Sequence, residues 1–181
     1  DPIGSRGLGD VYKRQKYVRE NNIPFFGICL GMQMAVIEFS RNVLGLNCAN
    51  STEMDENTQH PIISLMRDQK KIINKGGTMR LGAWDCKLSS KSLVKNIYKK
   101  NQISERHRHR YELNNDYLKE LSVKGFECTG VNPNTGLVEI IEISSHPWFI
   151  GVQYHPEYKS TVLEPHPCLL YTSPSPRDPI G

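Results

Sequence analysis

The sequence has little cysteine and no organised cysteine pattern. Its five cysteines form no Cys-x-x-Cys pair and show none of the spacings typical of zinc sites. An odd number of cysteines without a framework excludes a disulfide-stapled secreted scaffold and favours a reducing compartment, so we expect a cytoplasmic protein. The sequence Asn50-Ser51-Thr52 fits a glycosylation sequon. Because no export signal precedes it, we interpret it as a turn.

Long hydrophobic runs and a strong excess of one charge are also missing. No stretch is long enough to span a bilayer, and no secretory signal precedes the first polar segment. The net charge of +4 is mild and spread along the chain, so we expect neither nucleic acid nor a membrane as a partner. The 181 residues, 38% of them hydrophobic and 23% charged, are typical of one soluble domain with a sizeable core.

The two ends of the chain resemble a sequencing adapter. Residues 5–15 read SRGLGDVYKRQ and residues 168–178 read CLLYTSPSPRD. One DNA segment encodes both stretches when it is translated in opposite orientations with a shift of one base. We therefore expect residues 1–15 and 168–181 to be artefact, to be excluded from fold reasoning. Residues 16–167 would then be a domain truncated at both ends.

The hydrophobic periodicity predicts an α/β domain. Residues 46–61 are polar and turn-like, and Gly76-Gly77 indicates a tight turn rather than a phosphate loop. Helices are expected at the end of 16–22, and at 30–44 (stopped by Gly45), 92–99 and 117–124. Strands are expected at 25–28, 61–66, 79–88, 106–113, 126–131, 137–143 and 148–154.

The stretch PFFGICLGMQ places a cysteine between a short apolar strand and a helix. Residues 25–28 are apolar enough to be buried on both faces of a parallel sheet, and Cys29 stands at the corner that follows. Gly27 and Gly31 flank it, which matches the form of a Gly-x-Ser-x-Gly nucleophile elbow and lets the chain turn sharply. A helix N-terminus favours thiolate and can hold an oxyanion. The alternative is an ordinary buried cysteine.

A second apolar strand ends on His155-Pro156-Glu157. An imidazole at a strand end can take a thiol proton and return it to a leaving amine, and Glu157 could fix its tautomer. Taken alone, these residues fit a surface histidine in a proline turn better than a catalytic one. Together with the cysteine corner, they predict a Cys–His–Glu catalytic site.

Strand alternation in ERHRHRYE predicts two faces, with the arginines on one and the histidines on the other. A basic nucleic-acid strand is disfavoured because aromatic platforms are missing. A metal site at His107 and His109 is disfavoured because further ligands at suitable spacing are missing, so no metal is expected.

These motifs resemble those of the class I (triad) glutamine amidotransferases, Gly-x-Cys-x-Gly-x-Gln and His-Pro-Glu. The stretches ANSTE, GGTMRLG, ERHRHRYE and HPWF…GVQYHPEY are similar, more specifically, to the glutaminase domains of the CTP synthase family, over nearly all of residues 17–167. The resemblance implies a three-layer, flavodoxin-like α/β fold. It also implies Cys29 as nucleophile, His155 as acid–base and Glu157 as its orienter. Glutamine would be bound by Leu30, Gly31, Met32, Gln33, Glu53 and Arg110.

The resemblance further implies that ammonia from glutamine passes to an N-terminal synthetase domain, which aminates UTP to CTP with ATP and magnesium. GTP would activate the full enzyme, which would be a homotetramer. The fragment itself would hold no cofactor, would fold poorly alone and would have negligible activity. Alternatives are another triad amidotransferase or a γ-glutamyl hydrolase, and a regulatory module that keeps the fold without catalysis.

Overall fold

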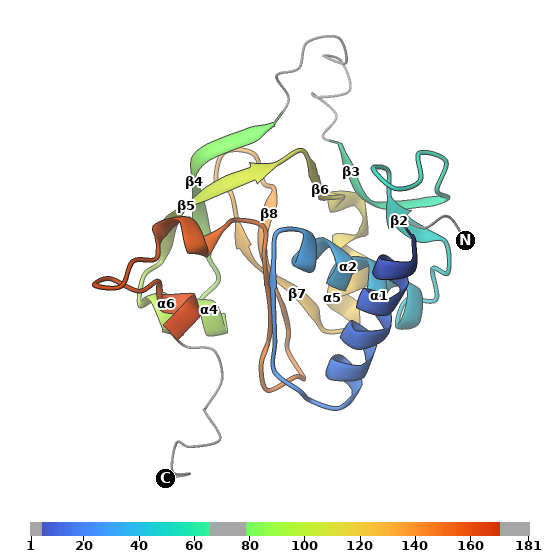
Figure 1. Cartoon of the computed structure of the whole chain (residues 1–181), viewed down its shortest axis with the longest axis horizontal. Helices are drawn as coiled ribbons and strands as arrows, with labels where there is room; N and C mark the ends of the chain where they lie inside the picture. The colour runs from blue at the N-terminus through green and yellow to red at the C-terminus, as the bar shows by residue number, and fades with distance from the viewer. Residues whose placement is uncertain (1–4, 66–78, 171–181) are drawn as a thin grey trace.

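The computed structural model describes residues 5–65 and 79–170, which form two β-sheets flanked by helices (Figure 1). The helices are α1 (Ser5–Glu20), α2 (Leu30–Asn42), α4 (Leu93–Tyr98), α5 (Leu118–Val123) and α6 (Pro167–Leu170), with 3-10 turns η1 (Asn115–Tyr117) and η2 (Pro156–Lys159). The strands are β1 (Phe25–Ile28), β2 (Ala49–Ser51), β3 (His60–Leu65), β4 (Arg80–Leu88), β5 (Gln102–His109), β6 (Tyr111–Leu113), β7 (Phe126–Val131), β8 (Val138–Ile143) and β9 (Phe149–Val152).

The larger sheet has the strand order β1-β9-β8-β7-β4-β5, and the smaller one has the order β2-β3-β6. In the larger sheet β1 and β9 are parallel, whereas the other neighbouring strands are antiparallel. The larger sheet is curled. The hydrogen bond from the backbone N–H of His155 to the carbonyl of Arg106 in β5, at 2.8 Å, shows this curl. The edge strand β5 therefore reaches the chain segment that follows β9, and this contact helps to place His155.

Helices cover both faces of the larger sheet, as a three-layer α/β fold requires. In Figure 1 α1, α2 and α5 lie on one side of β7 and β8, and α4 and α6 lie on the other. Each side has its own apolar core, with Ile141 and Phe149 in one and Ile140 and Ile150 in the other. Every residue of β8 is buried, since this strand lies inside the sheet with helices on both faces. The predicted fold class is confirmed.

Most predicted elements are found within a few residues of their expected bounds. The strand at 25–28 pairs in parallel with β9, but its residues are mostly half-buried because β1 lies at an edge of the sheet, so burial on both faces was a wrong prediction. The single strand expected at 106–113 is two strands, β5 and β6, separated at Arg110. Strand β2 was not predicted, since it has only three residues and lies in a polar stretch.

Helix α2 is buried along nine consecutive residues, from Met32 to Ser40, as expected for a helix packed between a sheet and other helices. Its buried Glu38 receives two hydrogen bonds from Arg19 of α1, at 2.7 and 2.9 Å. Such a paired fork satisfies a carboxylate that burial would otherwise penalise. Gly45 has a φ of +74°, which suits the predicted stop after the helix.

Residues predicted to be adapter sequence contribute to the structure. Gln15 of α1 donates to the carbonyl of Gly31 at 3.1 Å, and Cys168 of α6 is 2% exposed. The origin of residues 1–15 and 168–181 nevertheless stays a prediction, which resequencing of the source gene would test. The predicted turn at Gly76-Gly77 lies outside the described residues. In residues 5–65 and 79–170, no helix combines the length and apolarity needed to cross a membrane.

Candidate active site

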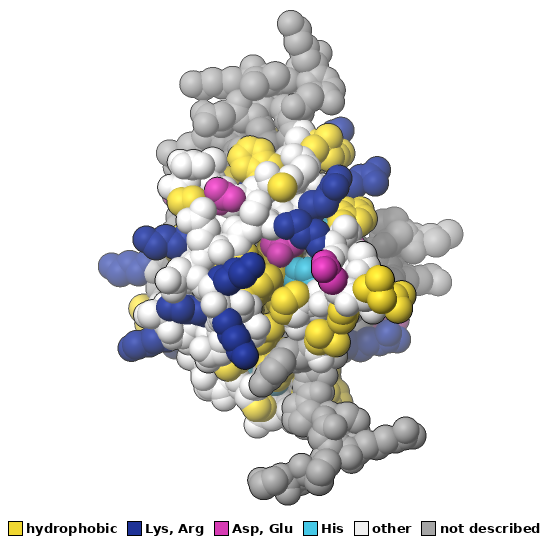
Figure 2. All heavy atoms as spheres, turned by 90° about the vertical axis from the view of Figure 1, so that its left-hand side faces the viewer, with side chains coloured by type: hydrophobic (Ala, Val, Ile, Leu, Met, Phe, Trp, Pro, Cys, Tyr) yellow, Lys and Arg dark blue, Asp and Glu magenta, His cyan; other side chains and the backbone are white. Residues whose placement is uncertain are grey.

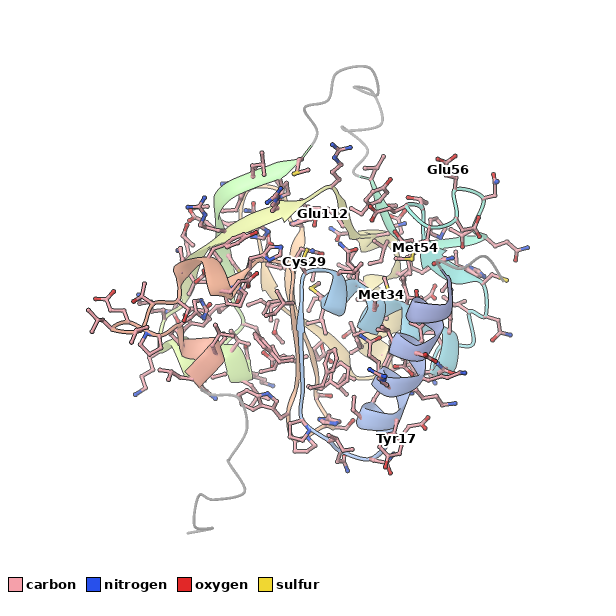
Figure 3. The ribbon with its side chains drawn as sticks, in the orientation of Figure 1. Tyr17, Cys29, Met34, Met54, Glu56 and Glu112 are labelled. Carbon is pink, nitrogen blue, oxygen red and sulfur yellow. The ribbon has the colours of Figure 1, made fainter. Side chains whose placement is uncertain are left out.

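Cys29 lies at a sharp corner between β1 and α2, where Figure 3 labels it. Its φ of +49° is unusual for a residue other than glycine, so the surrounding structure must hold it there. A Cβ on Gly27 would come within 2.8 Å of the backbone carbon of Gly31 and 2.9 Å of the nitrogen of Met32. The corner therefore requires glycine at position 27. A Cβ on Gly31 would meet nothing within 4 Å, so the steric reason predicted for that glycine is wrong.

The parallel pair β1 and β9 brings Cys29 close to the segment that contains His155. Ile28 pairs with Val152, so Cys29 and Gln153 follow neighbouring strands at the same end of the sheet. The backbone N–H of Cys29 donates to the carbonyl of Val152 at 2.7 Å, and the side chain of Gln153 contacts the Cys29 sulfur at 3.6 Å. The carboxyl ends of parallel strands are the usual place for a ligand site in an α/β fold.

His155 is held in one orientation by its neighbours. Its Nδ1 lies 2.6 Å from Oε1 of Glu157, and its ring stacks on Tyr158 with centroids 5.0 Å apart. Because a carboxylate accepts, Nδ1 carries the proton and Nε2 is left to accept one. The His155 side chain is 18% exposed, so a substrate can reach it. The geometry of His155 and Glu157 fits the predicted base and its orienter, and their catalytic roles stay a prediction.

Burial raises the pKa of the Cys29 thiol above its ordinary value, and the charges of Glu112 and Glu157 add to the rise. Hydrogen bonds from the Leu30 N–H and from Gln153 act in the opposite direction but do not cancel it. Figure 3 shows Glu112 close to Cys29. The helix N-terminus therefore favours thiolate as predicted, through the Leu30 N–H, but burial outweighs it and the net pKa is raised, so a nearby base is needed to remove the thiol proton.

The residues after Cys29 were predicted to line a glutamine pocket, and they face different ways. Leu30 is 47% exposed and Gly31 is half-buried. Met32 is fully buried in the core, so only its backbone could line a pocket. Gln33 is 4% exposed and uses its Nε2 on other protein groups, which leaves its Oε1 as the atom that could face a ligand.

Glu53 and Arg110 lie near one another through the small sheet. Strand β2 runs parallel to β3, and β6 runs antiparallel to β3. The last residue of β2 and the first residue of β6 therefore lie toward the same end of the small sheet. Glu53 follows β2 and Arg110 precedes β6, and both side chains are exposed. Burial raises the pKa of Tyr111, the charge of Glu53 raises it further and that of Arg110 lowers it, so both charges lie close to this ring.

Buried charges lie beneath this site. Arg80 donates to Glu112 at 3.0 Å and to Glu139 at 2.7 Å, and all three side chains are at most 3% exposed. Burial raises the pKa of Glu112 to about 8, although Arg80 lowers it. The histidines and arginines of β5 lie on opposite faces, as predicted, and the structure shows that the histidines face inward and the arginines outward. Burial, and to a smaller extent the charge of Arg80, lowers the pKa of both histidine rings. The pKa is about 2 for His107 and about 3 for His109.

Sequence reasoning missed Gln153 and the Arg80 cluster. Gln153 was detectable in principle, because it is the one fully polar side chain in the apolar run from Trp148 to Tyr154. No sequence spacing indicates the Arg80 cluster, because its carboxylates come from β6 and β8. The described residues contain no group of three or more histidine, cysteine, aspartate or glutamate side chains that could hold a metal ion. In Figure 2 a histidine ring lies between acidic side chains, with lysines and arginines above it and to its left.

Comparisons with known proteins identify the family of this chain. The family described as Glutamine amidotransferase class-I matches residues 3–169, which include most of the N-terminal stretch predicted to be adapter. CTP synthases from Flavobacterium johnsoniae and Flavobacterium psychrophilum are 63% and 64% identical over 168 residues. These alignments cover 93% of this chain, which spans only 31% of each relative's length.

The solved glutaminase domain of Trypanosoma brucei CTPS, with bound acivicin, superposes with a TM-score of 0.86 at 39% identity, covering 94% of this chain and 66% of that one. A protein from Thermoplasma acidophilum described as a GMP synthase subunit shares the fold alone, with a TM-score of 0.52 at 18% identity over 83% of this chain and 56% of that one. The chain thus belongs to the class I glutamine amidotransferase family and is homologous to the glutaminase domain of CTP synthases.

Proposed function

We propose that this chain is the glutaminase part of a longer CTP synthase, here called the complete enzyme. The observation that carries the proposal is the identity of 63% over 168 residues to a CTP synthase, in a chain that retains Cys29, His155 and Glu157. In the complete enzyme the ammonia would aminate UTP to CTP with ATP and magnesium, and GTP would activate the glutaminase. The complete enzyme would be a cytoplasmic homotetramer, as the family resemblance implies.

The chemistry of this chain follows from its residues. His155 Nε2 takes the Cys29 proton, and the sulfur attacks the side-chain amide carbon of glutamine. The N–H of Leu30, which already donates to the sulfur, would hold the oxyanion. His155 then gives its proton to the leaving amine, which departs as ammonia. Water, activated by the same ring, cleaves the glutamyl thioester to glutamate.

Glutamine would be recognised by complementary charges. The carboxylate of Glu53 suits the α-ammonium group of the substrate, and the planar guanidinium of Arg110 suits its α-carboxylate. Both side chains are exposed, and both charges act on the pKa of Tyr111. ATP and magnesium would bind in the synthetase part of the complete enzyme, so no step in this chain passes through them.

The proposal is tested by Cys29→Ala in the complete enzyme. CTP formation from glutamine should be abolished, whereas CTP formation from added ammonia should persist, because only the nitrogen source is lost. The exposed Cys48 provides a matched control, and Cys48→Ala should leave both reactions unchanged. Equal loss of both reactions in Cys29→Ala, or loss of neither, would contradict the proposal.

A further inference from the structure

Gln153 contacts the sulfur of Cys29 from a fully buried position. Its side chain is 0% exposed, and its Nε2 lies 3.6 Å from Sγ, a normal separation for a hydrogen bond to sulfur. It is the residue directly after Val152, whose carbonyl accepts from the N–H of Cys29 at 2.7 Å. One short segment at the end of β9 therefore holds both the backbone and the sulfur of the same cysteine.

The direction of the Gln153 amide is set by a chain of hydrogen bonds. The carbonyl of Tyr111 can only accept, so the group of Gln33 that faces it at 2.9 Å must be its amide nitrogen. The second hydrogen of that nitrogen points to Oε1 of Gln153, at 3.2 Å. With its oxygen occupied, Gln153 presents its NH₂ group to the sulfur. Reversing the amide would place two oxygen lone pairs against the sulfur and two donors against each other.

A donor in this position matters because Cys29 is half-buried. Burial raises the pKa of Cys29, and the hydrogen bond from Gln153 counteracts that rise. A neutral amide can do this without adding a charge that would compete with His155 for a proton. The donor is also rigid, because Gln33 and the backbone of β6 fix it from behind.

We propose that Gln153 is a positioning residue that holds the Cys29 sulfur and stabilises its thiolate, with Gln33 fixing the direction of the amide. The inference rests on the proposed function for its catalytic consequence. The predicted effect of Gln153 on the Cys29 thiolate does not depend on the substrate, so this effect can be measured without glutamine.

The test is the pH profile of Cys29 alkylation by iodoacetamide in the complete enzyme, followed by mass spectrometry of the peptide that contains Cys29. In Gln153→Met the midpoint should rise by about one pH unit, since a hydrogen bond to a charged group is lost. In Gln153→Glu it should rise further, because a carboxylate beside the sulfur adds a negative charge. Gln33→Met should give a smaller rise, because it only releases the amide. Gln102→Met, an exposed glutamine of β5 that contacts Asp85, should leave the midpoint unchanged.

Catalysis provides a second readout. Gln153→Met should lower kcat for glutamine hydrolysis about 10-fold with little change in KM, because the substrate contacts are intact. A midpoint in Gln153→Met equal to that of the unaltered enzyme would overturn the inference. If the Gln153 variants do not fold, an unchanged midpoint in Gln33→Met would overturn it instead. Absence of glutamine hydrolysis in the unaltered enzyme would contradict the proposed function, and leaves this pH profile as an independent result.

Discussion

At the scale of single residues, the burial and hydrogen bonds of each side chain in the candidate site determine its chemical properties. Burial raises the pKa of the Cys29 thiol, and the hydrogen bond to Glu157 orients the ring of His155, which is 18% exposed. Sequence motifs predicted these two residues and Glu157. They did not predict Gln153, because the role of a polar residue that directly follows an apolar strand is clear only when its partners are known.

Glutamine recognition gives a prediction at the same scale. Glu53→Gln and Arg110→Met in the complete enzyme should each raise KM for glutamine about 10- to 100-fold, because one charge-assisted contact is lost, and should change kcat little. Steady-state glutaminase kinetics would measure this. Arg108→Met, which alters a neighbouring exposed arginine of β5, is the control and should leave KM unchanged. Unaltered KM in the Glu53 and Arg110 variants would remove both residues from the substrate site.

At the scale of elements, the corner between β1 and α2 shows what the sequence could and could not predict. The apolar run and the change of period located the strand and the helix, and Gly27 proved sterically necessary. The division of β5 from β6 at Arg110 was not predictable, because the alternation of the side chains continues up to it. The curl that joins Arg106 to His155 depends on contacts far apart in the chain, which periodicity does not contain.

The corner predicts opposite results for its two glycines. Gly27→Ala should lower the free energy of unfolding by about 1–3 kcal/mol, because the added methyl overlaps the backbone of Gly31 and Met32. Gly31→Ala should change it by less than about 1 kcal/mol, since its added methyl meets nothing and alanine favours a helix. Pulse proteolysis in urea, followed on peptides of this domain, would measure both. Similar losses in the two variants would contradict this steric account.

At the scale of the whole molecule, the two sheets are joined by buried charge. Arg80 of β4 pairs with Glu139 of β8 in the larger sheet and with Glu112 of β6 in the smaller one. Removing one partner of a buried ionic cluster leaves the other charges uncompensated. Arg80→Met should therefore lower the free energy of unfolding by about 3–5 kcal/mol. The exposed Arg108→Met should change it by less than about 0.5 kcal/mol, and equal effects would show that the cluster does not join the sheets.

The buried histidines predict how stability depends on pH. The pKa values of His107 and His109 are lowered to about 2 and about 3, from an ordinary value of 6.5, so the folded state keeps both rings neutral. The unfolded chain takes up protons below about pH 6.5, and the free energy of unfolding should fall from there toward pH 3. Glu112, whose pKa is raised to about 8, should have the opposite effect. Its contribution to the free energy of unfolding should fall as the pH rises from 4.5 to 8. Proteolysis in urea at several pH values would measure the curve, and His107→Gln should flatten its acid side.

The central claim is that Cys29 is the nucleophile of a glutaminase site that it shares with His155. The most direct test is to treat the complete enzyme with an electrophilic glutamine analogue and to identify the modified peptide by mass spectrometry. We predict one adduct, on Cys29, that glutamine suppresses and that forms about 100- to 10,000-fold more slowly in His155→Ala. An adduct on the exposed Cys48 instead, or labelling of Cys29 at an unchanged rate in His155→Ala, would contradict the claim.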